Sequence, residues 1–116
     1  MTDRELLEAA ARAAGIARQL WDYEFCRERG HMVTWGMMWN PLTDDHDNAA
    51  LQCALLIDAE WLSNGYEASS VLATANGLHV EEHFHDNGGD RNATRRRAIV
   101  RAAASLAPGG DGGNGE

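Results

Sequence analysis

The dipeptide Asn76-Gly77 constrains the fold of this chain more than any other feature of its sequence. Asn-Gly readily takes positive φ at both central positions of a two-residue type I′ turn, so it is a strong signal for a β-hairpin. The flanking residues 66–75 and 78–85 are predicted to be the two antiparallel strands of this hairpin. Such strands form part of a sheet, and one face of that sheet must be covered by other elements.

An earlier part of the chain predicts a second hairpin. Trp21, Tyr23 and Phe25 alternate with acidic residues, and alternating aromatic residues are typical of a strand. Residues 27–30 are predicted to turn, and residues 31–37 to return as the partner strand. The two hairpins together predict one antiparallel sheet of about four strands.

Three helices are predicted around this sheet, each beginning at a side chain that can cap free backbone N–H groups. The predicted caps are Thr2 (in a capping box with Glu5), Thr43 or Asp44, and Asp90 or Asn92. The predicted helix ends are Gly15, the residues just before Asn64-Gly65, and Pro108. The fold class is therefore α+β, in the order α-β-β-α-β-β-α.

The length of 116 residues allows one domain and not two. Residues 1–107 are predicted to form this single α+β domain. Residues 108–116 contain five glycines and no large apolar side chain. A segment of this composition has nothing to bury, so it is predicted to be a disordered tail.

The formal net charge of −8 limits the partners of the chain. It argues against general nucleic-acid binding, which needs a net basic surface, and against an anionic membrane surface. It is typical of a soluble protein, or of one that meets a basic partner. The chain has no apolar run of the roughly 20 residues that a spanning helix needs and no apolar signal core at its start. Cys26 and Cys53 are predicted to be reduced thiols in a cytosol.

Three stretches carry a resemblance to a known family: TDRELLEAAA with AAGI at residues 2–11 and 13–16, WNPLTDD at 39–45, and ATRRRAIVRAAA at 93–104. In order and spacing they resemble the bacteriophage ABA-sandwich domain family, which are small proteins of phages and prophages. The chain departs from the family pattern at His46, where that pattern has glycine. The resemblance implies a phage origin and a layered α/β fold, and we expect the protein to lie in the host bacterial cytoplasm. It implies no activity.

Arginines on the last predicted helix are the first candidate binding site: Arg95, Arg96, Arg97 and Arg101. A guanidinium group can hold a phosphate or a carboxylate through two parallel hydrogen bonds. Trp35 is the candidate side chain to stack on a ligand or to anchor a partner. The alternative is a solvated helix face whose arginines pair with the many carboxylates of the chain.

A histidine-rich strand is the candidate metal site, with His79, Glu81, His83 and His85 on one face. Imidazoles two residues apart on a strand can bind one zinc ion, and the glutamate could ligate it or act as a base. A further ligand would come from His31, His46 or Asp86. The alternative is a polar sheet face opposite a core face of Leu78, Val80 and Phe84.

The motifs of known nucleophilic or phosphate-binding sites do not occur in the sequence. We therefore expect a non-enzymatic phage accessory protein that acts by binding and needs no cofactor, such as an anti-defence inhibitor of a host nucleic-acid-handling complex. One alternative is an oligomeric sponge that sequesters a nucleotide immune signal. Another is a metal-dependent hydrolase that uses zinc on the histidine strand. Exposed tryptophan and an open sheet edge also predict a homodimer.

Overall fold

The computed structural model describes residues 1–32, 34–63 and 68–107, apart from the side chains of Trp35 and Ala68. The elements in chain order are α1 (Asp3–Ala14), α2 (Arg18–Trp21), α3 (Tyr23–Glu28), the 3-10 helix η1 (Trp35–Met37), α4 (Asp45–Leu55), β1 (Asp58–Ser63), β2 (Ala68–Ala75), β3 (Leu78–His83), the 3-10 helix η2 (Phe84–Asn87) and α5 (Arg91–Ser105). The fold class is α+β, as the sequence predicts. The predicted tail, residues 108–116, lies outside the described residues.

The predicted caps of the three long helices are confirmed. Thr2 and Glu5 form the capping box of α1, with hydrogen bonds of 2.8 and 3.1 Å, and Gly15 ends that helix in the left-handed conformation. The side chain of Asp44 caps α4, and that of Asp90 caps α5. The local sequence therefore determines where these helices begin.

The hairpin at Asn76-Gly77 is also confirmed. Both residues have positive φ, 50° and 84°, and they join β2 to β3 in an antiparallel pair. In the described residues β1 pairs with the other edge of β2, so the sheet has three strands in the order β1-β2-β3. The predicted second strand of the hairpin was too long, because the chain turns into η2 at Phe84.

The earlier hairpin was predicted wrongly. Residues 21–25 end α2 and form the first half of α3, and the described part of residues 31–37 contains η1 in place of a strand. The reason lies in Asp22, whose carboxylate accepts the backbone N–H of Phe25 and so caps α3. The four-strand, three-helix arrangement is accordingly replaced, in the described residues, by three strands and five α-helices.

The end of the second predicted helix is a further correction. This helix was expected to run up to Asn64-Gly65, but α4 ends at Leu55 and residues 58–63 form β1. Leu56 takes the left-handed conformation at φ 54° and reverses the chain, and the next residue, Ile57, is buried in the core. Pairing of β1 with β2 therefore overrides the helical spacing of residues 51–58.

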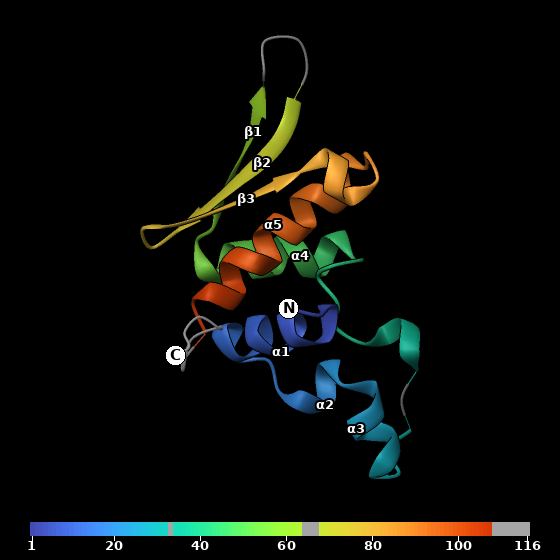
Figure 1. Cartoon of the computed structure of the whole chain (residues 1–116). Coiled ribbons are helices and arrows are strands. Elements are labelled where there is room, and N and C mark those ends of the chain that lie inside the picture. Colours follow the sequence, from blue (N-terminus) through green and yellow to red (C-terminus); the bar gives the residue numbers. More distant parts are fainter. Residues whose placement is uncertain (33, 64–67, 108–116) are drawn as a thin grey trace.

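Helix α5 lies at the centre of the molecule. Figure 1 shows it between the sheet on one side and α1 on the other, with α4 beside it, and Ile99 and Val100 of α5 are fully buried. The inner face of the sheet contributes Val71 and Ala73 to the same core. Helices α2 and α3 extend away from the sheet, beyond α1. In the described part of the chain the helices cover one face of the sheet, and the other, outer face is open.

Candidate functional site

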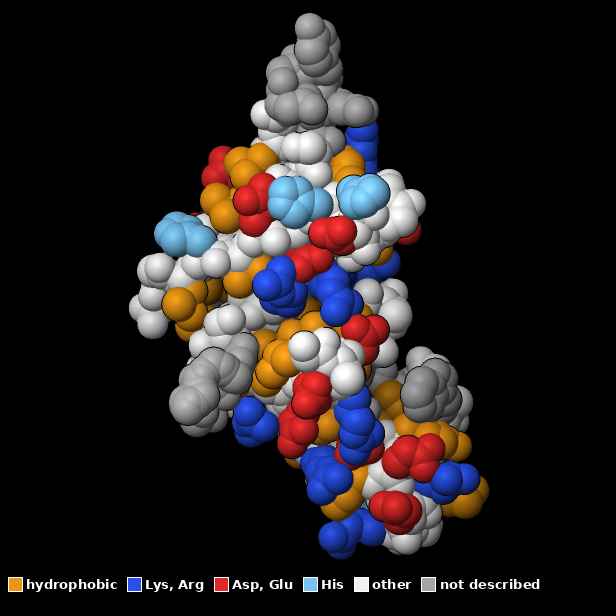
Figure 2. All heavy atoms as spheres, in the orientation of Figure 1, with side chains coloured by type: hydrophobic (Ala, Val, Ile, Leu, Met, Phe, Trp, Pro, Cys, Tyr) orange, Lys and Arg blue, Asp and Glu red, His pale blue; other side chains and the backbone are white. Residues whose placement is uncertain are grey.

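The outer face of the sheet carries most of the ionisable side chains of its three strands. Strand register places its residues in three rows: Asp58, Thr74 and His79; Glu60, Leu72 and Glu81; and Leu62, Ser70 and His83. All of the acidic residues and histidines in these rows are exposed. Figure 2 shows histidine and acidic side chains over the sheet, and arginines together with further acidic side chains over the helices below it.

Two of these carboxylates stand apart from the rest of the charged side chains. Among the described residues, neither Asp58 nor Glu60 has an ion-pair partner or a side-chain hydrogen bond. Both lie on β1, the edge strand that α5 covers least. They are therefore available to a cation from outside the chain.

The histidine strand does not converge on one point. Glu81 accepts a 2.6 Å hydrogen bond from Ser70 and lies 3.8 Å from the Nε2 atom of His83. His79 contacts Thr74 in the row of Asp58, at the other end of the strand from His83. His85 lies in η2, beyond the end of the strand. In the described part of the chain, no group of three or more His, Cys, Asp or Glu side chains could hold a metal ion.

The contacts around Glu81 also bear on nucleophilic catalysis. A serine nucleophile needs an imidazole beside its hydroxyl to accept the proton. The Ser70 hydroxyl donates to the carboxylate of Glu81, and His83 lies on the other side of that carboxylate. The imidazole of His83 is therefore not placed to accept the proton of Ser70, so the three groups do not form a catalytic triad.

The first pair of predicted arginines joins α5 to the start of α4. Arg96 donates from Nε to the backbone oxygen of Leu42 at 2.8 Å and from Nη1 to Asp45 at 2.9 Å. Arg95 lies 3.9 Å from the same carboxylate of Asp45. These side chains are thus used to dock two helices together.

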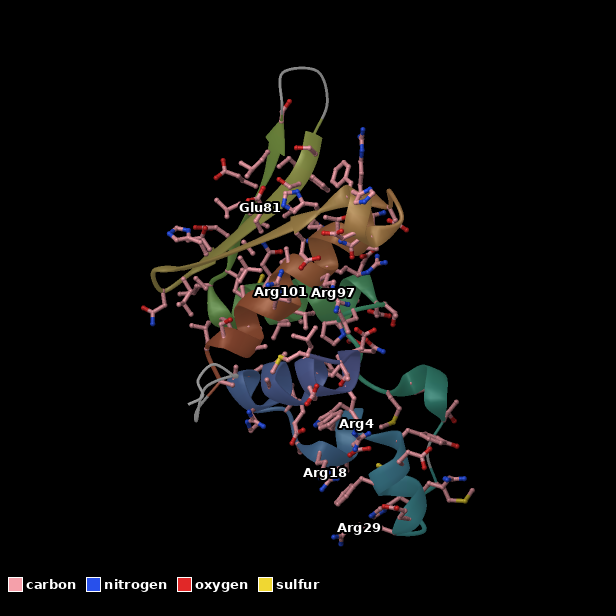
Figure 3. All side chains as sticks on the ribbon, in the orientation of Figure 1. Arg4, Arg18, Arg29, Glu81, Arg97 and Arg101 are labelled. Atoms are coloured by element: carbon pink, nitrogen blue, oxygen red, sulfur yellow. The ribbon has the colours of Figure 1, made fainter. Side chains whose placement is uncertain are left out.

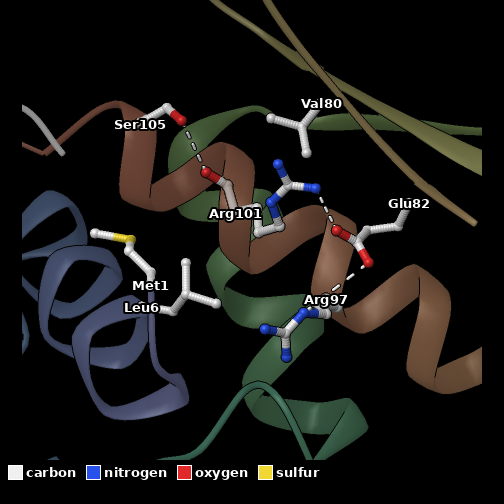
Figure 4. Close-up of a pocket in the computed structure, with 7 residues that line it drawn as sticks. All are labelled: Met1, Leu6, Val80, Glu82, Arg97, Arg101 and Ser105. Carbon is white, nitrogen blue, oxygen red and sulfur yellow. Dashed lines mark hydrogen bonds and ion pairs between the residues drawn. The ribbon is translucent and has the colours of Figure 1, made fainter. Parts of the chain in front are cut away.

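The second pair, Arg97 and Arg101, surrounds a buried carboxylate. Glu82 points inward from β3, is 8% exposed, and pairs with Arg101 directly and with Arg97 at 3.9 Å. Arg97 also donates to Asp3 of α1 at 2.9 Å. Both arginines extend from α5 toward the strand (Figure 3). They border a cavity of about 380 Å³ between α1, α5 and β3 (Figure 4).

The structure thus divides the predicted arginine site into two clusters, and each of the four side chains contacts a carboxylate. A phosphate would have to displace these carboxylates or share the arginines with them. Trp35 belongs to η1, and its side chain lies outside the described residues, so its role in binding stays a prediction.

Sequence reasoning missed Asp58 and Glu60, because it assigned their segment to a helix. A signal was present in the alternation of Ile57, Ala59 and Trp61, which face the inner side of the sheet while the two carboxylates face outward. Only the pairing with β2 distinguishes this short alternation from the end of the preceding helix.

Comparison with known proteins adds no relative: no protein-family model, curated protein or solved structure matches this chain. The resemblance to the ABA-sandwich family therefore stays a prediction from the three stretches. Every helix in the described residues is too short or too polar to cross a membrane.

Proposed function

We propose that this protein acts by binding and not by catalysis, and that the outer face of its sheet docks on a basic surface of a partner protein. The observation that carries this proposal is the pair of exposed carboxylates, Asp58 and Glu60, that no described side chain neutralises. Glu81 adds a third carboxylate in the row of Glu60. The charge of −8 for the whole chain has the same sign.

The composition of this face suits a protein interface. Leu62 and Leu72 are half-buried between the charged side chains, so an incoming surface meets apolar contact as well as charge. Carboxylates without an internal partner can pair with arginine or lysine without first breaking an existing ion pair. Negative charge on an open face also steers a basic partner toward it and raises the association rate.

The resemblance to the phage family gives this binding a biological setting. A nucleic-acid-handling complex needs a basic surface to neutralise phosphates. An acidic phage protein that occupies that surface would exclude the nucleic acid. We therefore propose an anti-defence role in the host bacterial cytoplasm, with a host defence complex as the partner.

The nucleotide alternative has less support from the geometry. The cavity beside Arg97 and Arg101 already contains the carboxylate of Glu82, which takes the position between the two guanidinium groups that a phosphate would need. The zinc hydrolase alternative would need a third ligand that joins Glu81 and His83.

A pull-down from host lysate tests the proposal. The unchanged protein is compared with Asp58→Asn/Glu60→Gln and with the control Glu8→Gln/Glu28→Gln, which removes two exposed carboxylates from α1 and α3. We expect the unchanged protein and the control to retain the same nucleic-acid-handling complex, and the sheet variant to bind it at least about tenfold more weakly. Full retention by the sheet variant, or no specific recovery by the unchanged protein, would refute the proposal.

A further inference from the structure

A concave surface lies at the end of the molecule that is opposite the open sheet. It is formed by α1 and by the segment that holds α2, α3 and η1, which we call the arm (residues 18–32 and 34–39). Together with the loop before α4, they enclose a cavity of about 450 Å³. This volume falls in the range of small-molecule sites in proteins, which is roughly 300–1,000 Å³.

The apolar wall of this cavity is mainly aromatic. Trp21, Tyr23 and Trp39 line it, together with the thioether of Met38. The electron-rich face of an aromatic ring attracts a cation, and tryptophan does so most strongly. The chain itself provides an example, since the guanidinium of Arg4 lies 5.6 Å from the ring centre of Trp21.

The wall is also held firmly in place. Trp39 packs against the hydrophobic core, and its backbone N–H donates to the backbone oxygen of Leu20 at 2.8 Å, which connects the loop to α2. Asp22 holds the arm to α1 through two hydrogen bonds from Arg4, at 3.2 and 2.8 Å. A ligand would therefore meet rings that are already in position, which reduces the entropic cost of binding.

The polar lining is predominantly acidic. Asp3, Glu24 and Asp44 line the cavity, and Arg4 is the one cation among its described lining residues. The charge of Arg4 is balanced by the buried carboxylate of Asp22. Asp3 and Glu24 each contact an arginine outside the lining, but their side chains remain 68% and 54% exposed, so both can accept further hydrogen bonds.

We propose that this cavity binds a small organic cation, a guanidinium or alkylammonium group. Its apolar part lies against Trp21 and Trp39, and its charged head faces the carboxylates. The site is separate from the sheet face and goes beyond the function proposed above. The cation has two sources, an arginine or lysine side chain of a peptide or a free small molecule, and both have the same recognition chemistry.

Isothermal titration with two matched probes tests the charge requirement. Nα-acetyl-arginine amide carries the guanidinium, and Nα-acetyl-citrulline amide has nearly the same shape without the charge. We expect the arginine probe to bind at least about tenfold more tightly. A probe concentration of about 20 mM is high enough to detect weak binding of a small fragment. Equal affinities for the two probes, or no heat with either of them, overturn the proposal.

Variants then locate the site. Trp21→Leu is expected to weaken binding of the arginine probe about 3- to 10-fold, whereas Trp61→Leu, at the sheet end, leaves it unchanged. Glu24 is exposed, so Glu24→Gln keeps the fold, and it should weaken binding about threefold even if Trp21→Leu does not fold. An unchanged affinity in Glu24→Gln refutes this location, and so does a folded Trp21→Leu whose affinity is unchanged.

Two further arms separate the possible sources and the two proposals. The blocked tripeptide Ala-Arg-Ala distinguishes the two sources of the cation. Tighter binding than that of Nα-acetyl-arginine amide indicates the side chain of a peptide, and weaker binding indicates a free small molecule. Asp58→Asn/Glu60→Gln should leave the affinity for the arginine probe unchanged. The proposal for the cavity can thus be refuted while the proposal for the sheet face stands, and the proposal for the sheet face can be refuted while that for the cavity stands.

Discussion

Asp22 shows how one residue organises a segment that the alternating sequence misrepresents. Its carboxylate is buried and accepts hydrogen bonds from Arg4 of α1, from Arg18 of α2 and from the backbone N–H of Phe25 at the start of α3. Burial acts to raise the pKa of this carboxyl group, but the hydrogen bonds from Arg18 and Arg4 outweigh it and hold the pKa below the usual 3.8. One side chain therefore connects three helices.

Acid should weaken the fold through this residue. Because the pKa of Asp22 is lower in the folded state than in the unfolded chain, its contribution is present above pH 3.8 and is lost as the pH falls through the folded value. Asp22→Asn keeps a capping side chain but loses both ion pairs, so we expect a cost of about 1–3 kcal/mol at pH 7. The two arginines are half exposed, which keeps this cost below that of a fully buried pair.

Urea denaturation of the unchanged protein and of Asp22→Asn at pH 7 and at pH 2.5 measures this effect. The gap between their free energies of unfolding should narrow at the lower pH. The exposed control Glu8→Gln should lie within about 0.5 kcal/mol of the unchanged protein at pH 7. A gap that is independent of pH would contradict the role given to Asp22.

Residues that act on their own neighbours could be predicted from sequence, and Asp22 could not. Thr2 needs only Glu5, three residues away, to complete its cap, and its backbone N–H and hydroxyl lower the pKa of Glu5 in return. Two partners of Asp22, Arg18 and Phe25, are also near it in sequence, but its link to Arg4 spans 18 residues. No local pattern reports such a pairing, so the alternation of Trp21, Tyr23 and Phe25 was the stronger signal.

At the level of elements, the junction between α4 and β1 contains a strained residue. Leu56 has φ 54° and is 84% exposed, so it takes a left-handed conformation without gaining apolar contacts. This conformation costs a residue with a Cβ atom about 1–2 kcal/mol, and replacement by glycine removes that cost. Glycine also has greater freedom in the unfolded chain, which offsets roughly half of the stabilisation. We expect Leu56→Gly to stabilise the protein by about 0.5–1 kcal/mol.

Thermal denaturation measures this change, with Leu20→Gly as the control. Leu20 is also exposed, but it lies within α2. Glycine there should destabilise the protein by about 1 kcal/mol, as it does in helix interiors. A lower melting temperature for Leu56→Gly would show that the leucine makes a contact that outweighs its strain.

The turn between β2 and β3 gives the opposite prediction. Gly77 has φ 84°, which alanine adopts only at a cost, so Gly77→Ala should destabilise the protein by about 1–2 kcal/mol. Asn76→Gly keeps a residue that accepts positive φ and should change stability by no more than about 0.5 kcal/mol. Equilibrium unfolding in urea compares the two, and an equal loss in both would contradict the type I′ explanation.

The two hairpin predictions differed in outcome because their evidence differed in kind. Asn76-Gly77 specifies a turn through backbone conformation, whichever elements surround it. The alternation at residues 21–25 is only five residues long, and two short helices that meet at Asp22 and place Trp21 and Tyr23 beside one cavity give the same spacing. Strand β1 was missed for a related reason, since its identity depends on β2, which follows it in the chain.

The whole molecule has two ends that are joined by α5. That helix packs against α1, α4 and all three strands, and the sequence predicted its cap and its apolar stripe. The α+β class also followed from sequence, whereas the polar sheet face was only the alternative to a metal site. The division of the arginines did not, because Glu82 and Asp45, which neutralise them, reach α5 from distant parts of the chain.

This unequal packing predicts unequal local stability. Helix α2 packs on α1 and α3 packs on α2, while α5 is enclosed by helices and strands. Apart from these contacts, the arm is held by Trp39, which packs against the hydrophobic core, and by Arg4 with Asp22. Segments with few buried apolar contacts open without global unfolding. We therefore expect the backbone amides of α3 to exchange with deuterium at least about 30-fold faster than those of α5.

Native-state hydrogen exchange, read by mass spectrometry, measures this difference. Asp22→Asn removes a link between the arm and α1, so it should speed exchange in α2 and α3 while β2 and β3 change only as far as global stability does. Nα-acetyl-arginine amide at saturation should slow exchange in the same two helices, because the cavity proposed to bind it is lined by residues of both helices and of α1. If α3 and α5 exchange at one common rate, the arm unfolds only with the core, and the lower local stability expected for the arm is refuted.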